Sequence, residues 1–200
     1  MPLSKFDVLP ILEPFLKRLK LCVDNGFRDF TTQHAESLHL MRAATKANLT
    51  FDHIIFHLRN EFDGDRAAAV VDSHSMTYLR LPKGIAVRIK KFDEAKHSSN
   101  YPTNQSKQLK AQDELEGCDV ETWLECGYIL NEAGTAIAEV HITFSVNDRV
   151  VWSVQLDDSE GGIVEDLPLL PHRDDDQPRR VRGKGTKKTK KTDGKGHEPK

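Results

Sequence analysis

Apolar residues recur every three or four positions through the first third of the chain, which is the spacing of one face of an α-helix. The first such run starts near Leu9, among two prolines, and we expect it to end near Gly26 because Asn-Gly is a helix-stop signal. Similar stripes predict a second helix over about 32–46 and a third over about 50–62. This part of the chain, 8–63, is therefore predicted to be helical.

From residue 69 the spacing changes to the alternation of apolar and polar residues that is typical of half-buried strands. The predicted elements are, in order, strands over 69–81 and 85–92, a helix over 105–116, and strands over 122–130, 136–145 and 149–156. Turn residues such as Pro82-Lys83-Gly84 separate them. The order predicts an α+β fold in which N-terminal helices pack on an antiparallel sheet of about five strands with one inserted helix.

The apolar pattern fades after residue 156, so we expect one domain over 1–156 (helical 8–63, sheet-rich 69–156) and a disordered tail over 157–200. The tail is acidic over 157–176 and basic over 177–200. The basic part holds ten Lys or Arg and two acids, about +8, whereas the whole chain carries a formal charge of −2. The residues before it therefore carry about −10, and the acidic segment 157–176 could fold back on the basic segment or compete with nucleic acid for it.

Composition sets the broad class of the protein. Hydrophobic residues make up 38% of the chain and charged residues 30%, a balance that supports a folded core. Three cysteines without C-x2-C spacing indicate reduced thiols. The N-terminus does not resemble a secretory signal, and no run approaches the ~18 apolar residues of a spanning helix. We therefore expect a cytoplasmic protein that does not associate with membranes.

A basic hairpin and the polar loop after it are the main candidate binding site. Strand alternation puts Arg88 and Lys90 on one face, and Arg80 on the preceding strand can share it. The candidate residues are Arg80, Arg88, Lys90 and Lys91 for charge, and Asn100, Thr103 and Gln105 for directional hydrogen bonds. Thr103 is a good N-cap for the helix that follows, and a helix N-terminus attracts anions. The alternative is an ordinary charged outer face of a sheet with a capping loop.

The basic tail has the composition of a nucleic-acid-binding arm. Its candidate residues are Arg179, Arg180, Arg182, Lys187, Lys188, Lys190 and Lys191. Because cations that meet phosphates release counterions, binding of nucleic acid through this arm should be salt-sensitive. A solvated terminus that is merely rich in lysine is the alternative.

A metal site and a nuclease site can each be considered, but each lacks a residue that its chemistry needs. His53, His57 and Glu61 lie one helical turn apart, but the residue after His53 is Ile54 where H-E-x-x-H needs a glutamate, so no metal is expected. No cofactor is expected either, because nucleotide-binding glycine motifs are absent. A nuclease or phosphodiesterase could use Asp72, His74 and Lys90, yet Arg88 stands where a magnesium site would place its second carboxylate.

Three strings, RIKKFDEAKHSSNYPTNQS, LECGYILNEAGTAIAEVHITFS and VVWSVQL, carry a resemblance over about residues 50–156. They resemble uncharacterised bacterial proteins encoded beside XRE-type regulators and ImmA/IrrE-like metallopeptidases in mobile-element or phage-defence cassettes. The resemblance implies a genomic neighbourhood, namely a toxin-antitoxin or phage-defence cassette, and it implies no activity. We therefore expect a non-catalytic, anion- or nucleic-acid-binding accessory or toxin-like component of a toxin-antitoxin or defence cassette. An enzyme, or a subunit that binds a helix-turn-helix regulator, are the alternatives, and the oligomeric state stays open.

Overall fold

Two long helices form the N-terminal part of the protein. A computed structural model describes residues 4–73, 75–98, 103–113, 115, 117–157 and, for the backbone only, 163–165. Helix α1 (Lys5–Gln33) and helix α2 (Ala43–Phe62) are joined by a 3₁₀ turn at Leu38–Leu40. Ser4 caps α1, because its hydroxyl accepts a hydrogen bond from the Asp7 amide at 3.4 Å.

Gly26 does not end the first helix, so the predicted boundary there was wrong. The residue lies inside α1 where α2 crosses it, and a Cβ atom at this position would stand 2.6 Å from the Cα of Ile54. Glycine is therefore needed for close helix packing, and α1 continues for two more turns. The predicted division into helices over 32–46 and 50–62 was also wrong, because most of 32–42 lies outside the α-helices and one uninterrupted helix, α2, begins at Ala43 and runs to Phe62.

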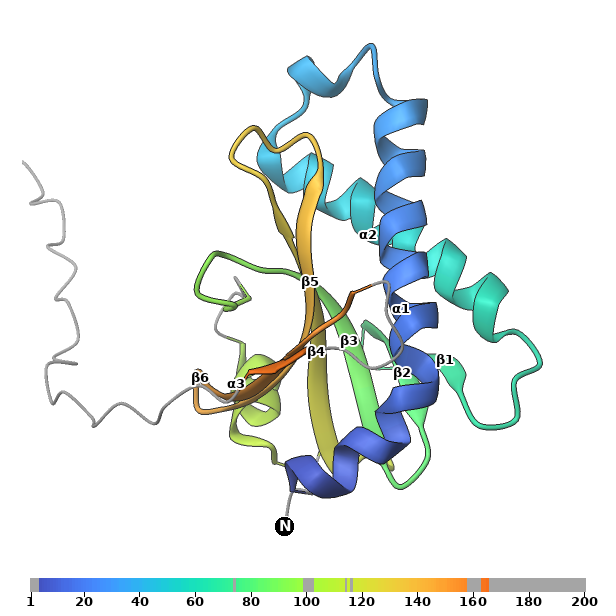
Figure 1. The fold of residues 1–200 in the computed structure, drawn as a ribbon, viewed down its shortest axis with the longest axis vertical. Coiled ribbons are helices and arrows are strands. Elements are labelled where there is room, and N and C mark those ends of the chain that lie inside the picture. The colour runs from blue at the N-terminus through green and yellow to red at the C-terminus, as the bar shows by residue number, and fades with distance from the viewer. Residues whose placement is uncertain are drawn as a thin grey trace, which may run out of the picture. The chain divides into compact units, whose positions relative to one another are not determined.

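The strands form a single seven-stranded sheet in sequential order (Figure 1). They are β1 (Ala69–Ser73), β2 (Met76–Leu81), β3 (Ile85–Lys91), β4 (Thr122–Leu130), β5 (Ile137–Val146), β6 (Arg149–Gln155) and β7 (Ile163–Glu165). All neighbours are antiparallel except β3 and β4, which run parallel because helix α3 (Asn104–Ala111) carries the chain back between them.

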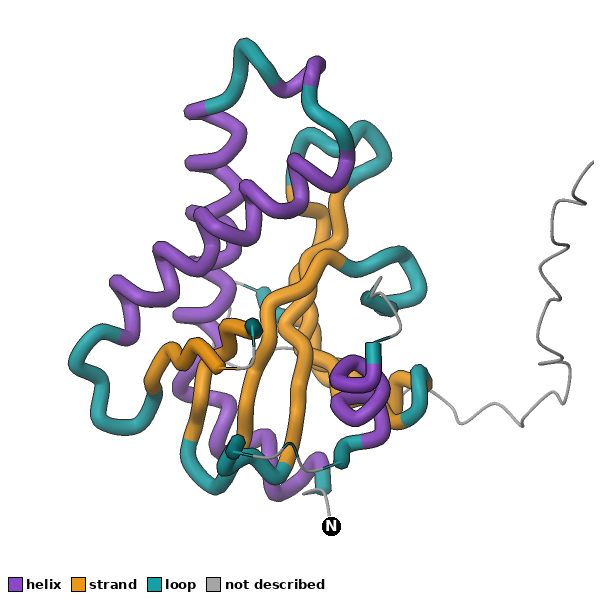
Figure 2. The backbone as a smooth tube through the Cα atoms, turned by 180° about the vertical axis from the view of Figure 1, so that it is seen from behind, coloured by secondary structure: helices purple, strands orange, loops and turns teal. Residues whose placement is uncertain are grey.

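The two faces of the sheet differ in what covers them. Helices α1 and α2 pack on one face through the main core, which includes Val87, Leu124 and Ile142. Helix α3 covers part of the other face, where Leu109 packs with Trp123 and neighbouring apolar side chains. Figure 1 shows α1 in front of the strands, and Figure 2 shows α3 in front of them from behind. The rest of the α3 face is polar.

The α+β architecture predicted from the sequence is confirmed, with helices N-terminal to the sheet. The sheet is mixed where an antiparallel one was expected. Strand β7, which pairs with β6, lies within the segment predicted to be disordered. Neither long helix, within the part of the chain that the structure describes, combines the length and apolar composition needed to cross a bilayer.

Candidate anion-binding site

Arg88 and Glu125 form the centre of the polar α3 face. They occupy paired positions on the parallel strands β3 and β4, so their side chains point the same way. The Arg88 Nη1 atom lies 3.9 Å from Glu125 Oε1, and the two side chains are only 13% and 21% exposed. Burial lowers the pKa of Arg88, which Glu125 partly opposes. Arg88 makes no hydrogen bond to any residue that the structure describes, so its guanidinium keeps most of its donor capacity.

Ser98 engages the other oxygen of Glu125, which it reaches because the preceding loop folds back on itself. The Asp93 carboxylate accepts hydrogen bonds from the amides of Ala95 at 3.0 Å and His97 at 2.9 Å, and Ser98 forms a β-bridge with Phe92. The Ser98 hydroxyl then donates to Glu125 Oε2 at 2.7 Å. Glu125 thus interacts with both Ser98 and Arg88, and it neutralises the positive charge of Arg88 only in part.

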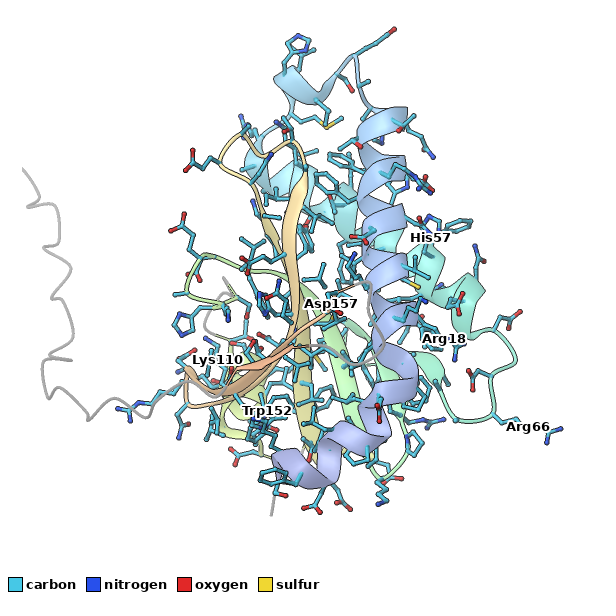
Figure 3. All side chains as sticks on the ribbon, viewed as in Figure 1. Arg18, His57, Arg66, Lys110, Trp152 and Asp157 are labelled. Carbon is cyan, nitrogen blue, oxygen red and sulfur yellow. The ribbon has the colours of Figure 1, made fainter. Side chains whose placement is uncertain are left out.

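A small cavity of about 40 Å³ opens beside this pair, beneath α3. Its wall includes Arg88, Glu125, Trp123, Ser106 and Lys110. Lys110 extends from α3, as Figure 3 shows, and forms an ion pair with Asp148 in the turn between β5 and β6. The volume has room for roughly three water molecules, or for one small ion or functional group, and not for a whole metabolite.

Trp123 adds a second unsatisfied donor to the same cavity wall. Its side chain is 4% exposed, and its indole Nε1 atom is buried without a hydrogen-bond partner among the described residues. Buried N–H groups are nearly always paired in native proteins. Arg88 and Trp123, which both belong to the cavity wall, thus carry donor groups without a close acceptor among the described residues.

Gln112 holds α3 against the sheet at the edge of the cavity. This residue ends α3 in the left-handed region, at φ 58°. Its amide Nε2 donates to the carbonyl oxygens of Trp123 and Ser145, both at 2.9 Å, and its Oε1 accepts from the Trp123 amide at 2.9 Å. The side chain thereby bridges β4 and β5 just beyond the end of their regular ladder.

Lys90 lies two residues beyond Arg88 on the same face. Burial lowers its pKa to about 8, and the nearby positive charge of Arg88 acts in the same direction. Glu125 opposes this shift and Lys110 adds to it. Arg88, Lys90 and Lys110 thus lie near Glu125 on the α3 face, and Lys110 is also paired with Asp148.

The structure brings together only part of the predicted binding site. Arg88 and Lys90 share a face as expected, and Arg80 shares it too, because it pairs with Ala86, but Arg80 is exposed and does not line the cavity. Lys91 points to the opposite face, as the alternation requires. The prediction that Thr103 caps a helix is confirmed, since Thr103 Oγ1 accepts from the Ser106 amide at 3.1 Å.

Gln105 lies half-buried on α3, while Asn100 falls outside the described residues. The seven tail residues from Arg179 to Lys191 also fall outside them. The predicted arm thus remains a prediction.

The residues proposed for a nuclease are not brought together. Asp72 lies on the face that α2 covers, where its carboxylate bonds to Arg59 Nη2 and Thr77 Oγ1, both at 2.6 Å. Lys90 lies on the opposite face. His74 falls outside the described residues. A magnesium site that joins Asp72 to Lys90 does not fit this arrangement.

His53, His57 and Glu61, considered above as metal ligands, each have a different partner. His57 Nε2 lies 2.7 Å from Asp29 Oδ2, and Glu61 Oε1 accepts from Arg18 Nε at 2.7 Å. His53 packs edge-on against His34. No group of three His, Cys, Asp or Glu side chains suited to a metal occurs in the described part of the chain.

A serine, a histidine and a glutamate meet on the α3 face, which the sequence did not indicate. Ser153 Oγ lies 3.2 Å from His141 Nδ1, and His141 Nε2 lies 2.6 Å from Glu139 Oε2. This resembles the connectivity of a hydrolase triad. However, Ser153 is 0% exposed and His141 1%, so no substrate reaches the hydroxyl in this conformation. The arrangement satisfies buried polar groups on the sheet.

Several residues of the cavity were missed at the sequence level. Glu125 offered one signal, because it is the single charged residue in the apolar run TWLECGYIL. Gln112, Lys110 and Trp123 offered none, since the contacts that matter join them to residues distant in the chain.

Comparisons with models of known protein families, with curated proteins and with solved structures find no match. Function is therefore argued from the geometry of the site.

Proposed function

We propose that this protein is a non-catalytic anion-binding component, and that the cavity beneath α3 receives one oxyanion group, either a free inorganic anion or one phosphate of a nucleic acid. The observation that carries the proposal is the buried Arg88 guanidinium, whose only ionic partner among the described residues is 3.9 Å away. A buried arginine without close acceptors is costly, and a phosphate or sulfate offers the paired oxygens that its fork fits.

The other donors of the wall favour the same class of ligand. The Trp123 N–H has no acceptor among the described residues, and Lys90 adds positive potential nearby, whereas Lys110 is paired with Asp148. Glu125 orients Arg88 without neutralising it fully, because it also accepts from Ser98. An anion would therefore complete the hydrogen bonding of groups that the fold has already placed.

The small volume limits how a nucleic acid would be recognised. A cavity of about 40 Å³ cannot hold a base, so the protein would engage a terminal or projecting phosphate and read no sequence there. The basic tail would supply nonspecific, salt-dependent affinity. The resemblance to cassette-encoded proteins supports an accessory or toxin-like role in such a cassette.

Isothermal titration of the full chain with phosphate, sulfate and a 5′-phosphorylated oligonucleotide tests the proposal. Replacing Arg88 by Met removes a charge-assisted contact of about 1.5–3 kcal/mol, which corresponds to roughly 10- to 150-fold weaker binding of the inorganic anions. Arg88→Lys should recover only part of the loss, because an ammonium cannot form the fork. Circular dichroism confirms that each variant is folded.

Arg80→Met is the matched control, because Arg80 lies exposed on the same sheet face outside the cavity. It should leave the binding of phosphate and sulfate unchanged. Equal losses in Arg80→Met and Arg88→Met would assign binding to the open sheet face, and unchanged affinity in folded Arg88→Met would refute the proposal.

A further inference from the structure

A cavity of about 430 Å³ lies on the side of the sheet that α1 and α2 cover, near the connection between these helices. Figures 1 and 2 both show the turn between β4 and β5 beside this connection. The two helices, the 3₁₀ turn that joins them and the β4–β5 turn together form the wall. Its apolar residues include Phe27 and Phe30 of α1, Leu38 of the 3₁₀ turn, Ala47 of α2, and Tyr128 and Leu130 of β4.

Local features of the chain explain why this space is open. Ala43 and Ala47 lie one turn apart on α2, so small side chains line this part of the wall. The Asn131 side chain fixes the β4–β5 turn, because its Oδ1 atom accepts a hydrogen bond from the Thr135 amide at 2.9 Å. Gly134, at φ 66°, allows the chain to reverse there. The wall is therefore in place before any ligand binds.

The charged residues of this wall are all basic. Lys46 of α2 and Lys91 of β3 line the cavity with His39, and the described residues of its wall include no aspartate or glutamate. Neither lysine has an ion-pair partner among the residues that the structure describes. Burial raises the pKa of Tyr128 to about 12, so its phenol stays neutral and adds no negative charge. Lys91 also lines an adjoining hollow with Asp93, whose carboxylate already accepts from two loop amides.

The size and the lining of the cavity limit the class of ligand. Sites for small molecules commonly measure about 300–1,000 Å³ and combine apolar walls with a few polar groups, and this cavity lies towards the lower end of that range. Aromatic and aliphatic side chains favour an apolar body. Two lysines without acidic partners favour a negative charge and disfavour a cation. A lysine typically packs its stem along an apolar wall and keeps its ammonium group in water, so the charge of the ligand should lie at the mouth.

We propose that this cavity is a binding site for a small organic acid, with an apolar body of medium chain length and one carboxylate. The apolar body packs against Phe27, Phe30 and Leu130, where its burial drives binding. The carboxylate lies at the mouth between Lys46 and Lys91, which hold it by charge. No covalent step is involved.

The inference does not depend on anion binding in the smaller cavity. The organic acid would bind on the side of the sheet that α1 and α2 cover, whereas the proposed function uses Arg88 on the α3 face. Saturating phosphate, at constant ionic strength, should therefore leave the affinity for the organic acid unchanged. Competition between the two ligands would place the acid beneath α3 and overturn the inference.

The test is isothermal titration of the full-length protein with octanoate, hexanoate, octanol and acetate. Octanoate should bind about fourfold tighter than hexanoate for each additional methylene that is buried. It should also bind at least fourfold tighter than octanol, which has the same chain without the charge. Acetate, which has the charge without the chain, should give no measurable binding. Equal affinities for octanoate and octanol, or no binding of octanoate, would overturn the proposal.

Variants assign the binding to this cavity. Replacing Lys46 and Lys91 together by Met should weaken octanoate binding roughly 4- to 25-fold, since an exposed ion pair contributes about two- to fivefold, and should leave octanol and phosphate binding unchanged. Lys17→Met, at an exposed position of α1, is the control and should change neither ligand.

Filling the cavity tests its apolar part. Ala47→Phe should weaken the binding of octanoate and octanol alike by at least fivefold, because the ring occupies their space. Ala44→Phe is the matched control, since Ala44 is exposed on the same helix, and it should bind both ligands as the wild type does. Unchanged octanoate affinity in a folded Ala47→Phe variant would show that the ligand binds elsewhere and would refute the site.

Discussion

Gln112 is the residue whose replacement tests the architecture of the α3 face most directly. Its side-chain amide makes three hydrogen bonds of 2.9 Å, two to Trp123 and one to Ser145. These bonds take the place of backbone hydrogen bonds between β4 and β5 just beyond the end of their regular pairing. Removing the amide should loosen both the sheet edge and the attachment of α3.

The expected magnitude follows from these three bonds. Gln112→Ala removes all of them and leaves backbone groups of β4 and β5 without partners, which should lower the free energy of unfolding by about 2–4 kcal/mol. Gln112→Glu keeps the acceptor but loses both donors, and it places a carboxylate oxygen 2.9 Å from two carbonyl oxygens. We therefore expect Gln112→Glu to be less stable than Gln112→Ala at pH 7, and to recover partly in acid, where the carboxyl can donate once.

Urea denaturation followed by tryptophan fluorescence measures these differences, since one of the two tryptophans, Trp123, reports from the site itself. Gln108→Ala is the matched control, because Gln108 is exposed on the same helix, and it should change stability by less than about 0.5 kcal/mol. A Gln112→Ala variant within that range of the wild type would show that the three bonds do not stabilise the fold. Gln112→Glu as stable as Gln112→Ala would refute the electrostatic reasoning.

Three further predictions concern the helices, the lysine and the thiols. Gly26→Ala should cost about 1–3 kcal/mol by overpacking against Ile54, so a raised melting temperature would contradict the close crossing. Lys90→Met should unfold less readily than the wild type at pH 7, where the native lysine is protonated at a cost. The difference in free energy of unfolding between Lys90→Met and the wild type should shrink between about pH 8 and 10.5, because the unfolded chain there still binds a proton that the native protein has released. The same pH dependence in Lys17→Met would argue against this explanation. Burial raises the pKa of Cys22 and Cys126 to about 12, so iodoacetamide at pH 8 should modify neither in the native protein, and peptide mapping that finds either one labelled would disprove their protection.

The periodic elements were the part of the structure that sequence reasoning could predict. Alternation alone placed Arg88 and Lys90 on one face of a strand, and the Thr103 cap followed from its side chain and position. The helix boundaries failed at Gly26, where a residue that ends isolated helices was required for a helix crossing. Local propensity carries no information about such a contact.

The cavity residues illustrate the same limit. Ser98, Lys110, Gln112 and Glu125 come from a loop, a helix, a cap and a strand, and no spacing in the chain joins them. Their meeting depends on the parallel pairing of β3 with β4, which sets Arg88 beside Glu125. The expected antiparallel sheet would have paired different residues.

The sequence by itself determined the order of helices and strands and the face to which each strand residue points, because these depend on backbone geometry that repeats every few residues. Only the tertiary structure decided that Arg88 would be buried with a carboxylate distant in the sequence, that Trp123 would find no acceptor among the described residues, and that Lys90 would lose basicity. Desolvation and charge coupling arise from neighbours brought together by folding, and these neighbours give the α3 face its proposed chemistry.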